Sequence, residues 1–268
     1  SDGLGGVPIH VNALNVEELI SPQRGPSVRE ALINNIAAVA AQASRLERPM
    51  LAHVNHPNTD WAKSMPWKDF AHVAGVGFFE VYNGHNGKID HGDAVHPSTE
   101  EMWDRANALR LRELDLPLLY GLATDDAHRF STWGAGHPNP GRGWVMVRGN
   151  EAEPDVIITA MQAGEFYASS GVLIRDIRTD AGRYTVEIVA EVGVEYVTRF
   201  MGSRLDDSRT SDTASEILAQ TSTNPASYSY EGDELFVRAV VESSRPHPNP
   251  HCEGDRERAW LQPVVIGS

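Results

Sequence analysis

Short apolar runs alternate with amphipathic segments over residues 1–174. In the clearest amphipathic segment, apolar residues recur on one helical face behind Ser27 and Glu30, which have the spacing of a capping box. This pattern predicts a helix over residues 28–46. Residues 49–56 then form a short, mostly apolar run that stops at Pro57, as a buried strand ending in a loop does.

The same alternation continues along the chain. Ser98 and Glu101 have the spacing of a second capping box. Four further elements are expected: a helix over 66–74, a strand over 76–82, a helix from 98 to about 114 and a strand over 116–123. Alternating strands and helices are typical of βα units, and therefore of an α/β layer or barrel whose site lies at the carboxyl ends of the strands.

The composition changes near residue 175. Runs such as 184–190 and 234–241 alternate apolar and polar side chains, which indicates strands with one buried face. We therefore expect two parts, residues 1–174 and a small β-rich subdomain over 175–268. The polar segments 202–215 and 243–258 are expected to be exposed loops.

The charge of the chain argues against some partners. Its 268 residues carry a formal net charge of -14, and the Lys and Arg residues form no basic run. Nucleic acid is therefore an unexpected partner. No stretch has the roughly 20 apolar residues that a membrane-spanning helix needs. The single cysteine, Cys252, excludes an internal disulfide, and the compartment stays open because the chain does not begin with Met.

Candidate chemistry follows the last strand of the first part. Asp126 and His128 are two residues apart, so both side chains point to one side of an extended segment and can bind one metal ion. A carboxylate together with an imidazole suits Zn, Mn or Fe better than Ca or Mg. The alternative is a carboxylate that caps the following turn and a histidine that serves only the loop.

Two other histidines are candidates because they adjoin apolar runs. His56 ends the strand predicted before Pro57, and the alternative is a simple turn residue. His10 lies in another apolar run, where a core histidine is the equally supported alternative. His53 would point to the opposite face from His56, so we interpret it as structural.

The remaining candidates are weaker. His85 lies in an Asn-Gly-His-Asn-Gly loop and is either a substrate contact or an incidental turn residue. Arg129 follows His128 and either binds a substrate anion or lies on the surface. The cluster of His247, His251 and Cys252 has no strand support and stays unassigned. Serine-nucleophile, P-loop and dinucleotide-binding motifs do not occur in a strand-to-helix context.

Together these motifs resemble those of a known superfamily. His10 in Ile-His-Val-Asn, His56 in Asn-His-Pro-Asn and the Asp126–His128 pair in Asp-Ala-His resemble the later motifs of the PHP (polymerase and histidinol phosphatase) superfamily. The segments Gly-Leu-Ala-Thr-Asp-Asp-Ala-His and Gly-Glu-Phe-Tyr-Ala-Ser-Ser-Gly are similar to its carbaryl-hydrolase-like branch. The resemblance covers about residues 8–174.

This resemblance implies a distorted (β/α)7 barrel that binds two or three divalent ions, Zn, Mn or Fe. It implies that His10, His56, Asp126 and His128 are metal ligands, and that Asp126 and His128 belong to the catalytic centre. The superfamily also has a His-x-His pair, an Asp-His pair and a Glu upstream of these motifs. Residues 1–6 resemble the loop after that Glu, so we expect the first barrel strands to belong to an N-terminal segment, which is itself a candidate partner.

The function expected from this resemblance is metal-dependent hydrolysis of a small-molecule ester. Phosphoester hydrolysis is the leading hypothesis. Carboxyl- or carbamate-ester hydrolysis is the alternative, and a non-catalytic binding module is the third reading. Substrate identity depends on loop shapes that the sequence does not specify.

Overall fold

The computed structural model of the chain describes residues 9–58, 65–85, 90–205 and 215–266. Residues 1–6, which resemble a superfamily loop, lie outside these ranges, as does most of the expected loop 202–215. In its first half the chain forms β1 (Val11–Leu14), α1 (Val28–Leu46), β2 (Leu51–Val54), α2 (Trp67–Ala71), β3 (Phe78–Asn83), α3 (Thr99–Leu109), the π-helical turn η1 (Arg110–Leu114) and β4 (Tyr120–Thr124).

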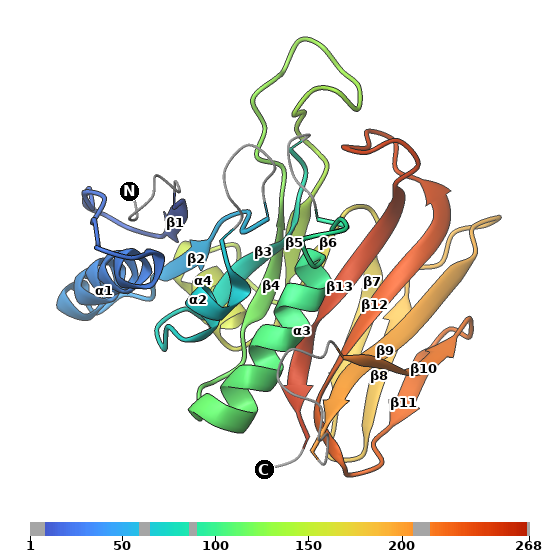
Figure 1. Cartoon of the computed structure of the whole chain (residues 1–268). Helices are drawn as coiled ribbons and strands as arrows, with labels where there is room; N and C mark the ends of the chain where they lie inside the picture. The colour runs from blue at the N-terminus through green and yellow to red at the C-terminus, as the bar shows by residue number, and fades with distance from the viewer. Residues whose placement is uncertain (1–8, 59–64, 86–89, 206–214, 267–268) are drawn as a thin grey trace. The chain divides into compact units, whose positions relative to one another are not determined.

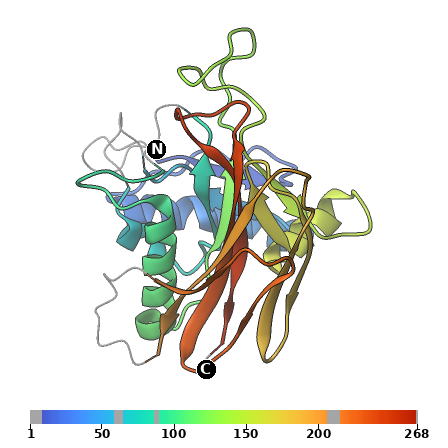
Figure 2. The same ribbon diagram turned by 90° about the vertical axis from the view of Figure 1, so that its right-hand side faces the viewer.

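The second half is dominated by strands. In order, it forms β5 (Trp144–Val147), α4 (Pro154–Gln162), β6 (Phe166–Ser169), β7 (Ile174–Thr179), β8 (Arg183–Ile188), β9 (Tyr196–Arg204), β10 (Glu216–Thr221), β11 (Ala226–Ser229), β12 (Glu234–Pro246) and β13 (Arg256–Val265). β12 and β13 run side by side as the longest of these strands (Figure 1), and they are followed easily in the second view (Figure 2).

The chain folds into two compact units that are interleaved along the sequence. Unit 1 comprises residues 1–81, 87–120 and 147–166, whereas unit 2 comprises 82–86, 121–146 and 167–268. The run from β7 to β13 belongs entirely to unit 2. The boundary expected near residue 175 marks the start of that run, and the division into 1–174 and 175–268 stays a prediction.

The four-stranded sheet has the strand order β1-β2-β3-β4 and is mixed. β2 pairs with β3 in parallel, but β1 is antiparallel to β2 and places Val11 opposite Val54. In unit 1 the rings of Phe70 and Phe79 stack with centroids 5.5 Å apart, and Trp103 of α3 lies 6.1 Å from Phe79. Aromatic packing therefore joins α2 and α3 to the buried strand β3.

The helix starts expected from the sequence are confirmed. The Ser27 side chain accepts a hydrogen bond from the Glu30 backbone N–H at the start of α1. At α3, Ser98 and Glu101 form both halves of a capping box. These bonds satisfy backbone N–H groups that a helix leaves without internal partners, which is why the local sequence suffices to begin both helices.

Replacing Ser98 with alanine is expected to lower the free energy of unfolding by about 1 kcal/mol, because the Glu101 backbone N–H loses its acceptor. Urea unfolding followed by circular dichroism measures the change. Ser98→Thr keeps a side-chain oxygen in place and is the control. Equal stabilities for the alanine and threonine variants would contradict the assigned cap.

Unit 2 contains two antiparallel layers. The six-stranded sheet has the order β10-β9-β12-β13-β6-β5, and the three-stranded sheet has the order β11-β8-β7. Tyr184 and Val186 from the small sheet join Phe200, Val237 and Leu261 from the large sheet in one buried cluster. The alternating pattern of residues 184–190 corresponds to β8, which has one buried face in the sandwich. Residues 234–241 of β12 are buried at every position, so the expectation of a single buried face is wrong for that strand.

The expected (β/α)7 barrel is wrong. Strands account for 34% of the residues and helices for 21%. Among the described residues, none of the three sheets closes into a barrel. After β4 the chain does not continue with further parallel βα units. Instead, β6 pairs antiparallel with β13, where Ala168 lies opposite Trp260, a residue far along the chain. Apolar runs of this length do not reveal the direction of their partner strand, so the same pattern fitted both architectures.

The expected exposed loop 243–258 is also corrected. β12 extends to Pro246 and β13 begins at Arg256, so the connection is only residues 247–255. Within it, His247 and His251 are buried. No helix among the described residues combines the length and apolar content needed to cross a bilayer.

Candidate functional site

His10 and His56 meet in unit 1 because of the antiparallel pairing of β1 and β2. His10 precedes β1 and His56 follows β2 by two residues, so the register of Val11 with Val54 brings both histidines to one end of the strand pair. His10 Nδ1 lies 3.0 Å from His56 Nε2, and the rings are almost perpendicular. This contact is a hydrogen bond between the two rings. Two imidazole ligands of one tetrahedral Zn ion have nitrogens about 3.3 Å apart, so a cation that replaced the bridging proton would find both nitrogens near ligand spacing.

Glu80 orients the His56 segment. It is a buried carboxylate on β3, and its Oε2 accepts the His56 backbone N–H at 2.7 Å. His56 itself has a φ of 20°, at the edge of the left-handed region that side chains other than glycine rarely adopt. Such conformations persist where the surroundings impose them and are concentrated at functional sites. The hydrogen bond to Glu80 is one of the contacts that hold His56 in this conformation.

His53 lies on the other side of the same strand end. Its Nδ1 is 4.0 Å from Glu80 Oε1. A hydrogen bond with the Val54 backbone favours the protonated imidazole, but burial outweighs it. Burial lowers the pKa of His53 to about 4. The side chain is therefore neutral at pH 7 and packed in the interior, in keeping with a structural role.

Asp126 belongs to unit 2 and is the second residue after β4. Its φ of 46° makes it a second candidate ligand with a left-handed backbone. Asn83 Nδ2 approaches Asp126 Oδ2 at 3.4 Å, and about a quarter of the Asp126 side chain, 23%, is exposed. Its other oxygen, Oδ1, lies 3.6 Å from His128 Nδ1, so the carboxylate and the imidazole are close enough to act on one cation or substrate.

The neighbouring Asp125 binds backbone N–H groups of its own loop. Its Oδ1 accepts the backbone N–H groups of Arg142 and Gly143, and its Oδ2 accepts that of Gly141. These three bonds close the loop 125–143 at its base. Of the two adjacent aspartates, one therefore anchors the loop, and Asp126 remains as the candidate ligand.

His128 is exposed and oriented by its own loop. Its Nδ1 lies 2.7 Å from the Asp126 carbonyl oxygen. Because a carbonyl only accepts, Nδ1 carries the proton and Nε2 keeps its lone pair, the tautomer found in metal-ligating histidines. The His85 ring lies 5.4 Å away and perpendicular to it. In unit 2 the structure thus brings together Asp126, His128 and His85.

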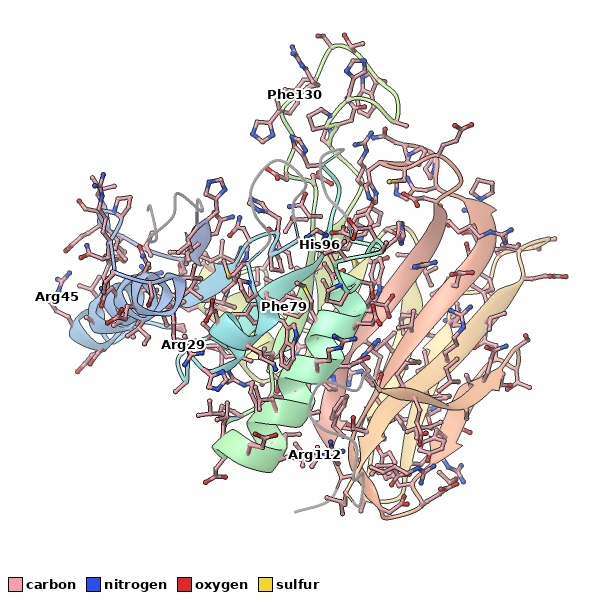
Figure 3. The ribbon with its side chains drawn as sticks, viewed as in Figure 1. Arg29, Arg45, Phe79, His96, Arg112 and Phe130 are labelled. Atoms are coloured by element: carbon pink, nitrogen blue, oxygen red, sulfur yellow. The ribbon has the colours of Figure 1, made fainter. Side chains whose placement is uncertain are left out.

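The loop 125–143 is well organised although it contains no helix or strand. The backbone N–H groups of His128 and Arg129 both donate to the Pro138 carbonyl, and buried Asn139 donates to the carbonyls of Arg129 and Thr132. Arg129 is exposed. Phe130, drawn on this loop in Figure 3, is 70% exposed, and Trp133 is 59% exposed. The loop therefore presents a cation and two aromatic rings to solvent.

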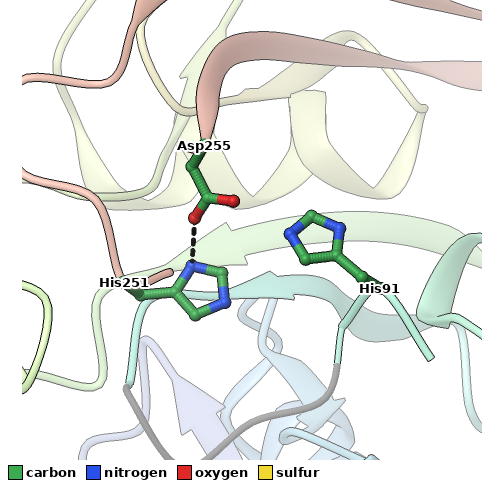
Figure 4. A group of neighbouring side chains, drawn as sticks. All are labelled: His91, His251 and Asp255. Atoms are coloured by element: carbon green, nitrogen blue, oxygen red, sulfur yellow. Dashed lines mark ion pairs between the residues drawn. The ribbon is translucent and has the colours of Figure 1, made fainter. Parts of the chain in front are cut away.

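The 247–255 connection contains a buried histidine cluster in unit 2. His247 Nε2 lies 3.2 Å from the Arg142 carbonyl, and its Nδ1 accepts the Asn249 backbone N–H. Burial lowers the pKa of His247. His251 Nδ1 pairs with Asp255 at 3.0 Å, the contact marked by the dashed line in Figure 4. Both backbone contacts of His247 are those of a structural residue.

An acidic group at the end of β11 and the start of β12 consists of Glu231, Asp233 and Glu234. Arg204 already pairs with Glu231 at 2.7 Å and with Asp233. Glu234 accepts the Tyr228 hydroxyl and two backbone N–H groups. A protein cation and internal donors thus satisfy these carboxylates, and we assign no metal to them.

Sequence reasoning missed three residues that organise the candidate groups: Glu80, Asp125 and Arg142. Glu80 had a readable signal, since it is a lone carboxylate inside the apolar strand Phe78–Asn83. Asp125 and Arg142 had none, because their partners are backbone groups brought close by the loop. The predicted ligands form one pair in unit 1 and one group in unit 2, and their joint membership of a single centre stays a prediction.

Comparisons of the chain with protein-family models, with curated proteins and with solved structures give no match.

Proposed function

We propose that this chain is a metal-dependent hydrolase. The observation that supports it most is the contact between His10 and His56, two histidines 46 residues apart whose ring nitrogens lie 3.0 Å from each other. His56 is buried at the end of β2, and the buried carboxylate of Glu80 accepts its backbone N–H. A divalent cation that replaced the proton between the rings would bind both imidazoles.

The donor set fits the proposed ion. His10 and His56 offer imidazole nitrogens, and in unit 2 Asp126 offers a carboxylate and His128 an Nε2 lone pair. Mixed nitrogen and oxygen ligands match Zn, Mn or Fe. We propose two or three such ions, with the unit 1 pair and the unit 2 group each contributing ligands.

A bound ion of this class supplies Lewis acidity and a water activated near neutral pH. The residues of the chain prepare the ligands and the substrate. Glu80 fixes the backbone of His56, and Asn83 holds Asp126 on one side. Arg129 is available for an anionic substrate group, and His85 is available to contact the substrate. Because the Arg129 guanidinium would pair with a negatively charged group, it favours a phosphoester as the substrate class.

A second substrate class has its own support. Phe130 and Trp133 expose most of their rings on the same loop as His128. Exposed aromatic side chains next to a reaction centre favour an apolar group in the substrate. Carboxyl or carbamate esters are therefore the alternative to phosphoesters.

The test combines metal analysis with activity. The chain is incubated with Mn²⁺ or Zn²⁺, and turnover of p-nitrophenyl phosphate, p-nitrophenyl acetate and a naphthyl carbamate is compared. We expect His56→Ala and Asp126→Ala each to lower kcat/KM for the preferred substrate at least about 100-fold and to lower the bound metal. The preferred substrate decides between the two ester classes.

Two histidines outside the proposed ligand groups serve as matched controls. His137→Ala changes the same loop as His128, and His72→Ala changes unit 1. Both are expected to keep activity and metal content. If the wild-type chain binds metal but turns over none of the three esters, the chain is a metal-containing binding module. If it binds no metal and Asp126→Ala changes nothing, the metal proposal is wrong as well.

A further inference from the structure

Arg142 occupies an unusual position at the end of the loop 125–143. Its side chain is completely buried. Its Nε donates to the Asn249 carbonyl at 3.0 Å, Nη1 to the Gly84 carbonyl at 2.7 Å and Nη2 to the Gly134 carbonyl at 3.0 Å. One guanidinium thus joins three loops of unit 2: the segment after β3, the loop 125–143 and the 247–255 connection.

Burying this cation is costly, and the charges of Asp125 and Asp255 offset only a part of that cost. All the hydrogen bonds that its guanidinium makes to described residues end on carbonyl or amide oxygens. Burial lowers the pKa of Arg142. A buried ion held by neutral groups contributes little stability compared with apolar packing, but its fixed fork of donors specifies one geometry.

That geometry bears directly on the unit 2 group. Gly84 precedes His85, and a Cβ added at Gly84 would lie 2.7 Å from Arg142 Cβ. The Arg142 backbone N–H donates to Asp125, the residue before Asp126, at 2.6 Å. Arg142 is therefore in contact with the immediate neighbours of both His85 and Asp126.

We propose that Arg142 is the positioning residue of the Asp126–His128 group. It fixes the loop 125–143 against the Gly84 segment, so that the ligands are preorganised and a cation does not have to order the loop on binding. This inference rests on the proposed metal-dependent function. It goes further by assigning the geometry of the group to a residue that touches neither metal nor substrate.

The experiment measures Mn²⁺ affinity rather than turnover. Calorimetric titration with Mn²⁺ is carried out on the full chain carrying His10→Ala and His56→Ala, so that the unit 2 group dominates binding. In this background we expect Arg142→Met to weaken Mn²⁺ affinity about 10- to 100-fold. Arg142→Lys, which keeps the charge and a part of the donors, should restore some of the loss.

Arg110 of unit 1 provides the matched control. It is equally buried and also donates to backbone carbonyls, those of Ala71, Val73 and Pro117. Arg110→Met should lower the melting temperature but leave Mn²⁺ affinity unchanged. If Arg142 were merely structural, Arg142→Met would give the same result. Titrations are made well below each melting temperature. If Arg142→Met does not fold, the comparison of Arg142→Lys with Arg110→Lys takes its place.

The outcomes separate the inference from the proposed function. If the background chain binds Mn²⁺ and the Arg142 variants bind it equally well, the positioning role is overturned and the metal proposal stands. If the background chain itself binds no Mn²⁺, the unit 2 ligand group is overturned, and the positioning role with it.

Discussion

Replacement of Trp103 with alanine is expected to lower the free energy of unfolding by about 3–5 kcal/mol. Trp103 is fully buried in unit 1, and its ring lies 6.1 Å from that of Phe79. Its Nε1 donates to the Leu119 carbonyl at 2.7 Å. Truncation removes this bond and leaves a cavity between α3 and the sheet, because close-packed neighbours relax only partly.

Two variants separate these contributions in urea unfolding. Trp103→Phe keeps an aromatic ring in the core, and Leu119 still accepts from Asn107, so we expect a loss of only about 1–2 kcal/mol. Trp133→Ala removes an exposed tryptophan and should change stability by less than about 0.5 kcal/mol. Similar costs at positions 103 and 133 would show that the packing around α3 is not as described.

Acidification is expected to destabilise the fold through His53. Its pKa is about 4 in the folded protein against an ordinary 6.5, because burial penalises the charged imidazole. Between these values the unfolded chain holds more protons than the folded chain, so stability falls as the pH falls from 6.5 to 4. At pH 4 the loss from this residue approaches about 3 kcal/mol.

The variant His53→Leu tests this effect. Unfolding free energies of the wild type and the variant are measured at pH 7.5, 5.5 and 4.5. The wild type should lose about 2–3 kcal/mol more than the variant over this range, since leucine does not titrate. Carboxylates and His247 are common to both proteins and cancel in the comparison. Parallel pH dependences would contradict the assignment.

The places of the candidate ligands in the fold were predictable only in part, and the reasons differ from residue to residue. His56 follows β2 as its apolar run and Pro57 indicated. His10 was also placed next to a strand, but it precedes β1 rather than following it. It meets His56 because β1 is antiparallel to β2, a direction that the apolar pattern of four residues does not encode. The same ambiguity produced the incorrect barrel.

The contacts that orient these residues were beyond prediction from the pattern. Asp125 and Asp126 are identical in type and adjacent, yet Asp125 accepts three backbone N–H groups and Asp126 faces Asn83. Which carboxylate anchors the loop and which lies beside Asn83 and His128 depends on a turn of the chain at φ 46°. The role of Arg142 likewise becomes visible only in the folded chain, where its guanidinium donates to Gly84, Gly134 and Asn249.

Local signals along the chain were sufficient for the helices and their first residues, because caps and amphipathic faces act between residues a few positions apart. Strand direction, sheet membership and the neighbours of each candidate ligand needed the folded chain. They arise from pairings between distant segments, such as β6 with β13, and hydrogen bonding there depends on how the whole backbone packs.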